Sequence, residues 1–184
     1  MGKFKVISRV PNGVMVIENT VFGDQRGYFM ESYNRADLAE IGITDDFIQD
    51  NESSSVYGVI RGLHYQAAPY TQAKLVRVIR GKVLDVAVDI RRDSPDFKKV
   101  FLTELSGDNH RQFYIPRGFA HGFAVLSDEA VFAYKCDNIY CPASERGIIF
   151  NDRELAIDWQ IPEDKMLLSE KDLKHPYFHK AELF

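Results

Sequence analysis

The central part of the chain alternates apolar and polar residues with a period of two. Between residues 83 and 90, aliphatic side chains recur at every second position, with Asp85 and Asp89 between them. This pattern predicts a half-buried β-strand. The β-branched run 75–79 precedes it, and Arg80-Gly81-Lys82 places a glycine where a tight hairpin needs a positive φ. We therefore expect residues 75–79 and 83–90 to pair as a hairpin.

Three more short strands follow at regular spacing. Residues 112–115 form a run that ends at Pro116, and the runs 119–126 and 130–136 flank the polar turn Ser127-Asp128-Glu129. Several short strands with turn residues between them are typical of β-sandwiches and barrels.

Helical patterns are sparse. Asn34 can cap a helix over residues 35–41 that Gly42 ends, and Ser169 can cap a short helix near the end of the sequence. We find no internal repeat, low-complexity tract or interdomain linker. The sequence therefore predicts a mainly β fold, an antiparallel double-sheet jelly roll with short peripheral helices.

Length, composition and charge narrow the function classes. The 184 residues suit a single domain over 1–184, and a net charge of −4 does not suit binding through a broad basic surface, so no nucleic-acid partner is expected. No apolar stretch reaches the ~20 residues of a membrane span and no signal peptide is recognisable, so we expect no membrane association and a cytoplasmic location. Cys136 and Cys141 are too few for a disulfide framework and are expected to be reduced thiols.

Three histidines lie among polar or glycine-rich residues. His64 follows Arg61-Gly62-Leu63, His110 lies in a Gly-Asp-Asn turn, and His121 precedes Gly122. Taken alone, His64 fits a structural role as well as a catalytic one, because imidazole titrates near neutral pH but also packs well. His110 is expected to be solvated.

The spacing of Pro116, Gly118 and His121 resembles the second motif of the cupin superfamily, in which the histidine often binds a metal. A metal-binding cupin takes two further ligands from a His-x-His pair in its first motif, whereas this chain has only His64 there, within LHYQ. A closed metal site needs three or four good ligands. We therefore expect a metal-free acid/base pocket.

A set of segments resembles the RmlC-type sugar-nucleotide epimerases of the cupin superfamily, in particular the dTDP-4-dehydrorhamnose 3,5-epimerases. The matching segments occur in order along nearly the whole chain: DQRGYFME at 24–31, QDNES at 49–53, GVIRGLHYQ at 58–66, QAKLVR at 72–77, DIR at 89–91, GFAHGF at 118–123, YKC at 134–136, ND at 151–152 and LSEKD at 168–172. Each segment is weak alone, but the ordered set is specific.

The resemblance implies a cofactor-free homodimer that acts on a dTDP-4-keto-6-deoxy sugar and inverts C3 and C5, the carbons beside the ketone, on the way to rhamnose. Such chemistry needs a base on one face of the sugar, an acid on the other, and a donor for the enolate oxygen. By resemblance His64 is the base, Tyr134 the acid, Lys74 the cation at the keto oxygen and Asp172 the partner of the base. The alternatives are a core aromatic at Tyr134, an exposed lysine at Lys74, and a capping box that joins Asp172 to Ser169.

The remaining matches concern substrate binding. Arg26 and Arg61 match residues that meet the diphosphate or sugar, for which a forked guanidinium is well suited, and Tyr140 matches an aromatic that stacks on thymine. Other nucleotide or sugar contacts are matched by Phe29, Glu31, Gln49, Asn51, His121, Glu145 and Lys171. For the charged members, an ordinary solvated role is the alternative.

One geometric conflict arises between Arg61 and His64. In a regular strand, residues three apart point to opposite faces, yet the resemblance places both in one pocket. We therefore predict a bulge at Gly62 that re-aims one of them.

Three other functions are compatible with parts of the sequence. A relative could invert only C3 or only C5 with the same residues. A metal-dependent cupin oxygenase or isomerase would need the His-x-His pair that is missing here. A non-catalytic sugar-nucleotide binding protein would keep Arg26, Arg61 and Tyr140 but would not need His64, Lys74 and Tyr134 together.

Overall fold

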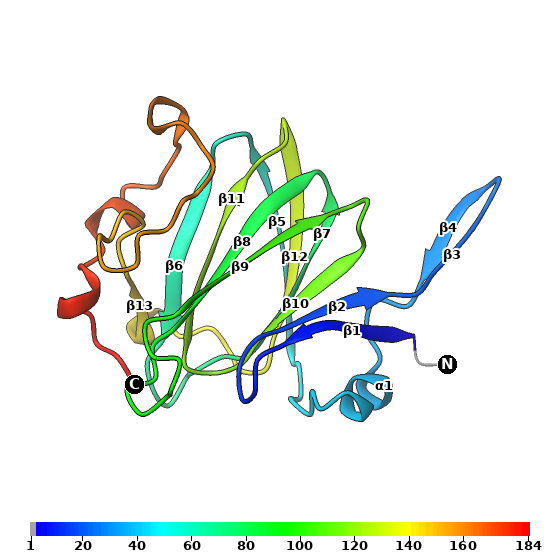
Figure 1. The fold of residues 1–184 in the computed structure, drawn as a ribbon, viewed down its shortest axis with the longest axis horizontal. Coiled ribbons are helices and arrows are strands. Elements are labelled where there is room, and N and C mark those ends of the chain that lie inside the picture. Colours follow the sequence, from blue (N-terminus) through cyan, green and yellow to red (C-terminus); the bar gives the residue numbers. More distant parts are fainter. Residues whose placement is uncertain (1–2) are drawn as a thin grey trace.

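Two antiparallel sheets face each other in the computed structural model, which describes residues 3–184 (Figure 1). The larger sheet has six strands, in the spatial order β1 Phe4–Arg9, β2 Met15–Asn19, β10 Arg111–Ile115, β7 Lys74–Arg80, β12 Glu129–Cys136 and β5 Gln49–Val56. The smaller sheet has five, in the order β13 Glu145–Gly147, β6 Ile60–Gln66, β11 Phe119–Val125, β8 Lys82–Asp89 and β9 Val100–Ser106. From β5 onward the chain passes repeatedly between the sheets, which confirms the predicted jelly roll.

The peripheral elements are short. The helix α1 Arg35–Glu40 begins where Asn34 Oδ1 accepts hydrogen bonds from two backbone N–H groups, and it ends within one residue of the predicted boundary. The predicted last helix is a single 3-10 turn, η3 Asp172–Lys174. The other 3-10 turns are η1 Pro142–Ser144, η2 Glu163–Lys165 and η4 Phe178–Lys180.

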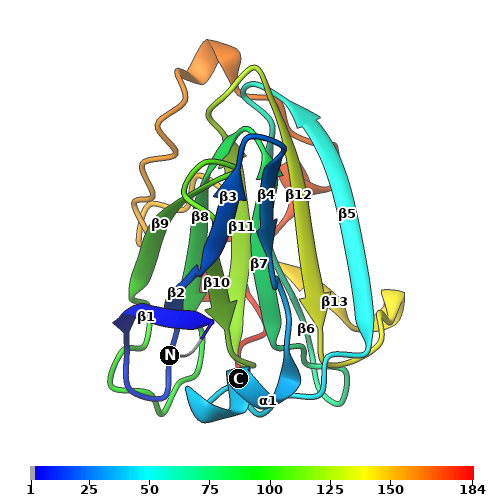
Figure 2. The same cartoon turned by 90° about the vertical axis from the view of Figure 1, so that its right-hand side faces the viewer.

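A two-stranded hairpin, β3 Val21–Asp24 and β4 Gly27–Met30, projects from the body of the molecule. Figures 1 and 2 show it extending beyond the six-stranded sheet, away from the C-terminal segment. The sequence did not predict this hairpin, because its eight strand residues show no clear alternation of apolar and polar positions.

Residues 3–184 include no helix that is long and apolar enough to cross a bilayer. The expected cytoplasmic location stays a prediction. Cys136 and Cys141 are both free thiols, as expected.

The predicted hairpin of residues 75–79 and 83–90 was wrong. Strand β7 pairs with β10 and β12 in the larger sheet, whereas β8 pairs with β11 and β9 in the smaller one. The chain changes sheets at Gly81, and side chains such as Val78 and Val83 belong to the same core between the sheets. Both strands already have two hydrogen-bonded neighbours, so neither has a free edge for the other.

The predicted half-burial of residues 83–90 was also wrong, because β8 is covered on both faces. Its aliphatic face packs against the C-terminal segment, including Trp159 and Phe178. Asp85 and Asp89 point the other way and are fully buried, where His121 and Arg91 respectively bind their carboxylates. The polar period in this strand therefore marks buried carboxylates that have hydrogen-bond partners and not a solvent-facing surface.

A bulge at Gly62 resolves the conflict between Arg61 and His64. Opposite β11, His121 pairs with His64 and Phe123 with Arg61, so three steps along β6 match two along β11. Gly62 has a φ of +123°, and a Cβ there would lie 2.5 Å from the Cα of Gly122. The predicted bulge is confirmed, and Arg61 and His64 line the same cavity.

We expect Gly62→Ala to lower the free energy of unfolding by about 1–3 kcal/mol, because the new side chain needs an unfavourable φ and meets the backbone of β11. Urea denaturation measures the change. Gly23→Ala is the control, since a Cβ there meets only the Gly27 carbonyl oxygen, at 3.7 Å. Equal stability of Gly62→Ala and the wild type would show that the bulge does not depend on glycine.

Candidate active site

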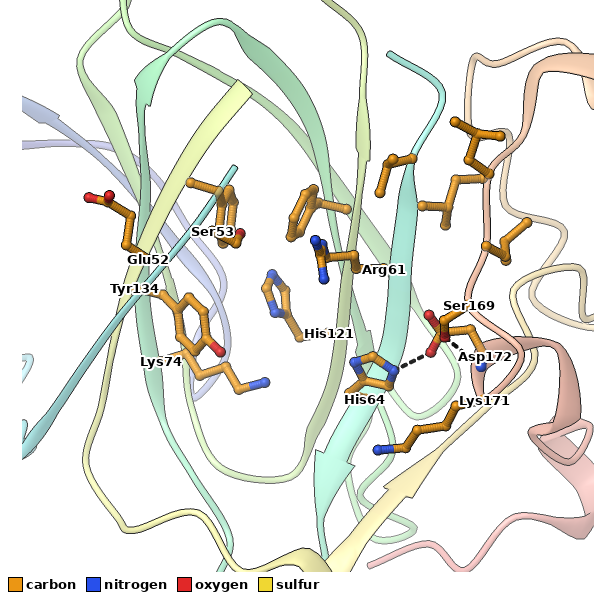
Figure 3. Close-up of a pocket in the computed structure, with 16 residues that line it drawn as sticks. Glu52, Ser53, Arg61, His64, Lys74, His121, Tyr134, Ser169, Lys171 and Asp172 are labelled. Carbon is orange, nitrogen blue, oxygen red and sulfur yellow. Dashed lines mark hydrogen bonds and ion pairs between the residues drawn. The ribbon is translucent and has the colours of Figure 1, made fainter. Parts of the chain in front are cut away.

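A cavity of about 450 Å³ opens between the two sheets (Figure 3). Strands β5, β6, β7, β11 and β12 line it, and residues 167–172 of the C-terminal segment close one side. A second cavity of about 370 Å³ shares His64, Lys74 and Tyr134 with the first. These three residues therefore lie where the two cavities adjoin.

The C-terminal segment reaches the cavity by pairing with the start of β6. Leu167 forms a parallel bridge with Val59; its N–H donates to Gly58 O and its carbonyl accepts from Ile60 N–H, both at 2.9 Å. This short pairing directs the five following residues toward His64.

His64 and Asp172 form a hydrogen-bonded pair at this junction. His64 Nε2 lies 2.5 Å from Asp172 Oδ1, and Asp172 is only 4% exposed. Burial would raise the pKa of Asp172, but the neighbouring imidazoles of His175 and His64 outweigh it and hold the pKa below its ordinary value. Because an ionised carboxylate only accepts, Nε2 carries the proton and Nδ1 is left as the basic nitrogen, on the side that faces the cavity (Figure 3).

Asp172 forms one half of the predicted capping box while its carboxylate pairs with His64. Its backbone N–H donates to Ser169 Oγ at 3.1 Å, as a capping arrangement requires, while its carboxylate binds His64. The cap therefore orients the residue and leaves its side chain free for the cavity.

Tyr134 and Lys74 face His64 from the opposite sheet (Figure 3). They lie on the adjacent strands β12 and β7, where Tyr134 pairs with Val76 and Lys74 with Cys136. Burial raises the pKa of the Tyr134 phenol, helped by Cys136 and Glu145 and opposed by Arg61, so the hydroxyl keeps its proton at neutral pH.

Lys74 is a desolvated cation. Burial lowers its pKa, and Cys136, Asp85 and Glu145 only partly offset this effect. Among residues 3–184, no carboxylate lies within ion-pair distance of its ammonium group. Lys74 therefore presents to the cavity an amino group that has no ion-pair partner among the described residues and whose charged form burial disfavours.

His121 is a buried residue in the lining of the first cavity. Its Nε2 is 2.9 Å from Asp85 Oδ1, and both side chains are buried. Burial lowers the pKa of His121 despite the neighbouring Asp85, which favours the neutral imidazole. The structure thus places His121 in the first cavity, as its predicted binding role requires.

The polar residues around the second cavity form a connected set. Glu145 accepts a hydrogen bond from the Tyr140 hydroxyl and forms an ion pair with Lys171, both at 2.5 Å. Burial would raise the pKa of Glu145, but these two partners lower it. Gln49 Oε1 accepts from the Tyr140 backbone N–H, and Gln49 Nε2 donates to Asn51. Four predicted binding residues, Gln49, Asn51, Tyr140 and Glu145, line this cavity.

Arg61 reaches the first cavity from β6. Its guanidinium donates to Ser55 Oγ from Nε and Nη2, at 3.2 and 3.1 Å, so a neutral hydroxyl positions it and leaves its charge uncompensated. Lys171 lines the same cavity.

Arg26, Phe29 and Glu31 lie outside both cavities. Arg26 and Phe29 are on the projecting hairpin, where Phe29 is 67% exposed and Arg26 pairs with Asp24. Glu31 follows the hairpin and pairs with Lys3. Within one chain, these three predicted contacts are not brought to His64.

Several lining residues were not singled out from the sequence, namely Glu52, Ser53, Gln72 and Cys136. Ser53 had a readable signal, because Gln49, Asn51 and Ser53 repeat with period two along β5. Both faces of β5 carry polar residues, so the strand shows no alternation of hydrophobic and polar positions that would reveal its inward face. Burial raises the pKa of the Cys136 thiol to about 11, with Lys74 opposing, so the thiol is neutral.

One group of side chains resembles a metal site. Ligand atoms of His64, Asp172 and His175 lie within 4.8 Å of one another. Two ligands of a tetrahedral zinc ion stand ~3.3 Å apart, farther than the His64–Asp172 contact, and the cavity also holds Arg61, Lys74 and Lys171. We interpret the group as a hydrogen-bonded cluster, and the expected absence of a metal stays a prediction.

Comparison with known proteins identifies the family. The family model described as dTDP-4-dehydrorhamnose 3,5-epimerase matches residues 10–180. A protein of that name from Shigella flexneri is 52% identical over 172 residues, which are 93% of this chain and 94% of the relative. The chain belongs to the dTDP-4-dehydrorhamnose 3,5-epimerase family. It is an isomerase that acts on a dTDP-linked sugar, as the sequence predicted.

Solved structures of this epimerase family share the whole fold. The crystal structure of dTDP-4-dehydrorhamnose 3,5-epimerase from Elizabethkingia anophelis gives a TM-score of 0.91 at 52% identity, covering 96% of this chain and 97% of that one. The epimerase RmlC of Legionella pneumophila, in complex with dTDP-4-keto-L-rhamnose, gives 0.92 at 48% identity, covering 97% and 95%. The jelly roll predicted from the strand pattern is therefore also the fold of these solved structures.

We expect epimerisation to fall at alkaline pH as Lys74 loses its proton, at a pH below the ordinary range of lysine because burial lowers its pKa. In Lys74→Arg the fall should move to higher pH, since guanidinium stays charged, although the maximal rate should be lower. The dependence of kcat/KM on pH measures this shift. Identical alkaline limbs in both proteins would exclude Lys74 as the titrating group.

Proposed function

We propose that this epimerase converts dTDP-4-dehydro-6-deoxyglucose to dTDP-4-dehydrorhamnose by metal-free proton transfer at C3 and C5. The observation that carries the proposal is the placement of His64 and Tyr134 on opposite sheets, facing across one cavity with Lys74 between them. Inversion at a carbon requires removal of a proton from one face and its return on the other, which an acid and a base on opposite sides of the sugar can perform.

Each inversion proceeds in two steps. His64 Nδ1 takes the proton from the carbon beside the ketone, and the C–H electron pair forms a carbon–carbon double bond while the carbonyl electrons move to oxygen. The Tyr134 hydroxyl then gives its proton to the opposite face of that carbon, and the carbonyl re-forms. Proton exchange with solvent returns His64 to the neutral form and Tyr134 to the phenol.

Lys74 stabilises the enolate in this scheme. Its ammonium group has no carboxylate partner among the described residues, so its field acts on the oxygen whose charge grows in the transition state. Asp172 supports the positive charge that His64 gains in the same step.

The substrate's charged and aromatic parts have separate complements. Arg61 supplies local positive charge for the diphosphate in a protein whose net charge is −4, whereas the charge of Lys171 is balanced by Glu145. Tyr140, about half exposed at the rim of the second cavity, offers a ring face for thymine.

Proton NMR in deuterated water tests the function. Chelator-treated wild type should incorporate deuterium at both C3 and C5 of dTDP-4-dehydro-6-deoxyglucose, and His64→Ala should slow exchange by about 10²–10⁴-fold while the fold is retained. Tyr134→Phe should impair inversion more than substrate binding. Near-normal turnover in His64→Ala would remove His64 as the base.

Other outcomes of the same experiment separate the alternatives. Exchange with inversion at one carbon only would indicate a mono-epimerase. Activity that is lost with the chelator and restored by a metal would indicate a metal-dependent cupin. Binding of the nucleotide sugar without exchange would indicate a binding protein.

We also propose a homodimer in which the hairpin β3–β4 of one subunit covers the cavity of its partner. Arg26 and Phe29 match substrate contacts by resemblance, yet they lie outside their own cavity. The hairpin carries three large aromatic side chains that are more than half exposed, Phe22, Tyr28 and Phe29, and such a patch favours burial in an interface.

Subunit mixing tests this arrangement. When Arg26→Ala and His64→Ala proteins are unfolded together and refolded, activity should recover to about a quarter of the wild-type value, because half of the dimers are mixed and each holds one complete site. If the hairpin served its own subunit, both sites of a mixed dimer would be defective and no activity would return. A monomer by light scattering would also contradict the proposal.

A further inference from the structure

A second histidine, His175, lies against the His64–Asp172 pair. The two imidazole rings meet edge to face, with centroids 5.4 Å apart and an interplanar angle of 74°. His175 Nε2 lies 3.5 Å from Asp172 Oδ1, the same oxygen that accepts the proton of His64 Nε2. One carboxylate oxygen thus faces two imidazole nitrogens.

The His175 ring occupies a site that is shaped for it. It packs on Gly147, where a Cβ would lie 2.5 Å from the ring carbon Cε1, so only glycine leaves room. Gly147 is the residue of β13 that pairs with His64 in β6. The next residue, Pro176, is fixed because its carbonyl accepts the N–H of Ile149 at 2.9 Å. The backbone of β13 at Gly147 and the backbone of the C-terminal segment at Pro176 therefore hold the His175 ring beside His64.

No group among the described residues forms a hydrogen bond with His175 Nε2. This nitrogen is buried, and Asp172 Oδ1 lies 3.5 Å from it. An ionised carboxylate can accept several donors, and the lowered pKa of Asp172 keeps it ionised. Hydrogen bonds in unliganded active sites are often long and shorten when substrate binds.

We propose that His175 is a positioning residue whose Nε2–H donates to Asp172 Oδ1 and fixes the carboxylate so that the proton of His64 stays on Nε2. This keeps Nδ1 of His64 free to accept the substrate proton. The inference rests on the proposed role of His64 as the base. A third group that orients a catalytic base is a recurrent arrangement in enzymes. Loss of a comparable orienting partner at metal sites commonly costs about 10–100-fold in affinity or activity.

His175→Phe removes the donor and keeps an aromatic ring of similar size. We expect kcat to fall about tenfold with KM changed by less than about twofold, because the substrate contacts remain. The ¹⁵N shifts of the His64 ring, measured without substrate, should change from one Nε2–H tautomer to a mixture. His179→Phe is the matched control, since His179 is exposed on η4 outside the cavities, and it should change neither quantity.

Two further variants separate positioning from packing. His175→Gln keeps an N–H donor and should restore kcat to within about threefold of the wild type, together with the single tautomer. Gly147→Ala keeps the imidazole but displaces it, and it should reproduce the defect of His175→Phe.

The proposal is overturned if His175→Phe leaves the tautomer of His64 unchanged, whether or not kcat falls, because a fall in kcat alone would indicate packing. It is also overturned if His175→Gln is as impaired as His175→Phe. Failure of the proposed function is distinguishable, because normal turnover in His64→Ala would refute the base, whereas the tautomer measurement requires no turnover.

Discussion

The hydrogen bond between His64 and Asp172 joins residues 108 positions apart and connects the C-terminal segment to the five-stranded sheet. Burial of Asp172 would be costly without a donor, so the carboxylate and the imidazole stabilise each other's position. The same segment supplies Lys171 to the cavity and reaches it through the bridge between Leu167 and Val59. The outer face of β8 packs on this segment and so helps to position the segment's site residues, although that face does not line the cavity.

The jelly roll explains why the acid and the base face each other. Because the chain alternates between sheets, β6 and β12 lie in opposite sheets and their inward side chains point at one cavity. The bulge at Gly62 adds Arg61 to the face that carries His64, so one strand contributes two functional groups that regular geometry would separate.

The sequence predicted the chemistry better than the connections between strands. The run 83–90 was correctly assigned as a strand, but local alternation does not reveal which sheet a strand joins, or that Asp85 and Asp89 face buried partners. The pocket residues followed from an ordered resemblance. His175 followed from no pattern, because its position beside Asp172 depends on how the C-terminal segment docks. Arg26 was predicted as a binding residue, but its location outside the cavity was not, because that location is a property of the projecting hairpin.

Burial disfavours the charged forms of both Asp172 and Lys74, but only Asp172 has partners that outweigh this effect. Asp172 is desolvated but has imidazole donors, so its pKa is lowered and its charge is kept. Lys74 has no carboxylate partner among residues 3–184, so burial lowers its pKa and disfavours its protonated form. Among residues 3–184, neither Arg61 nor Lys74 pairs with a carboxylate in the cavity, and at Lys74 the negative charge that would complete the site is the one that develops on an enolate oxygen. An interaction that strengthens only as charge develops lowers the barrier and not merely the energy of the bound substrate, which is the condition for raising kcat.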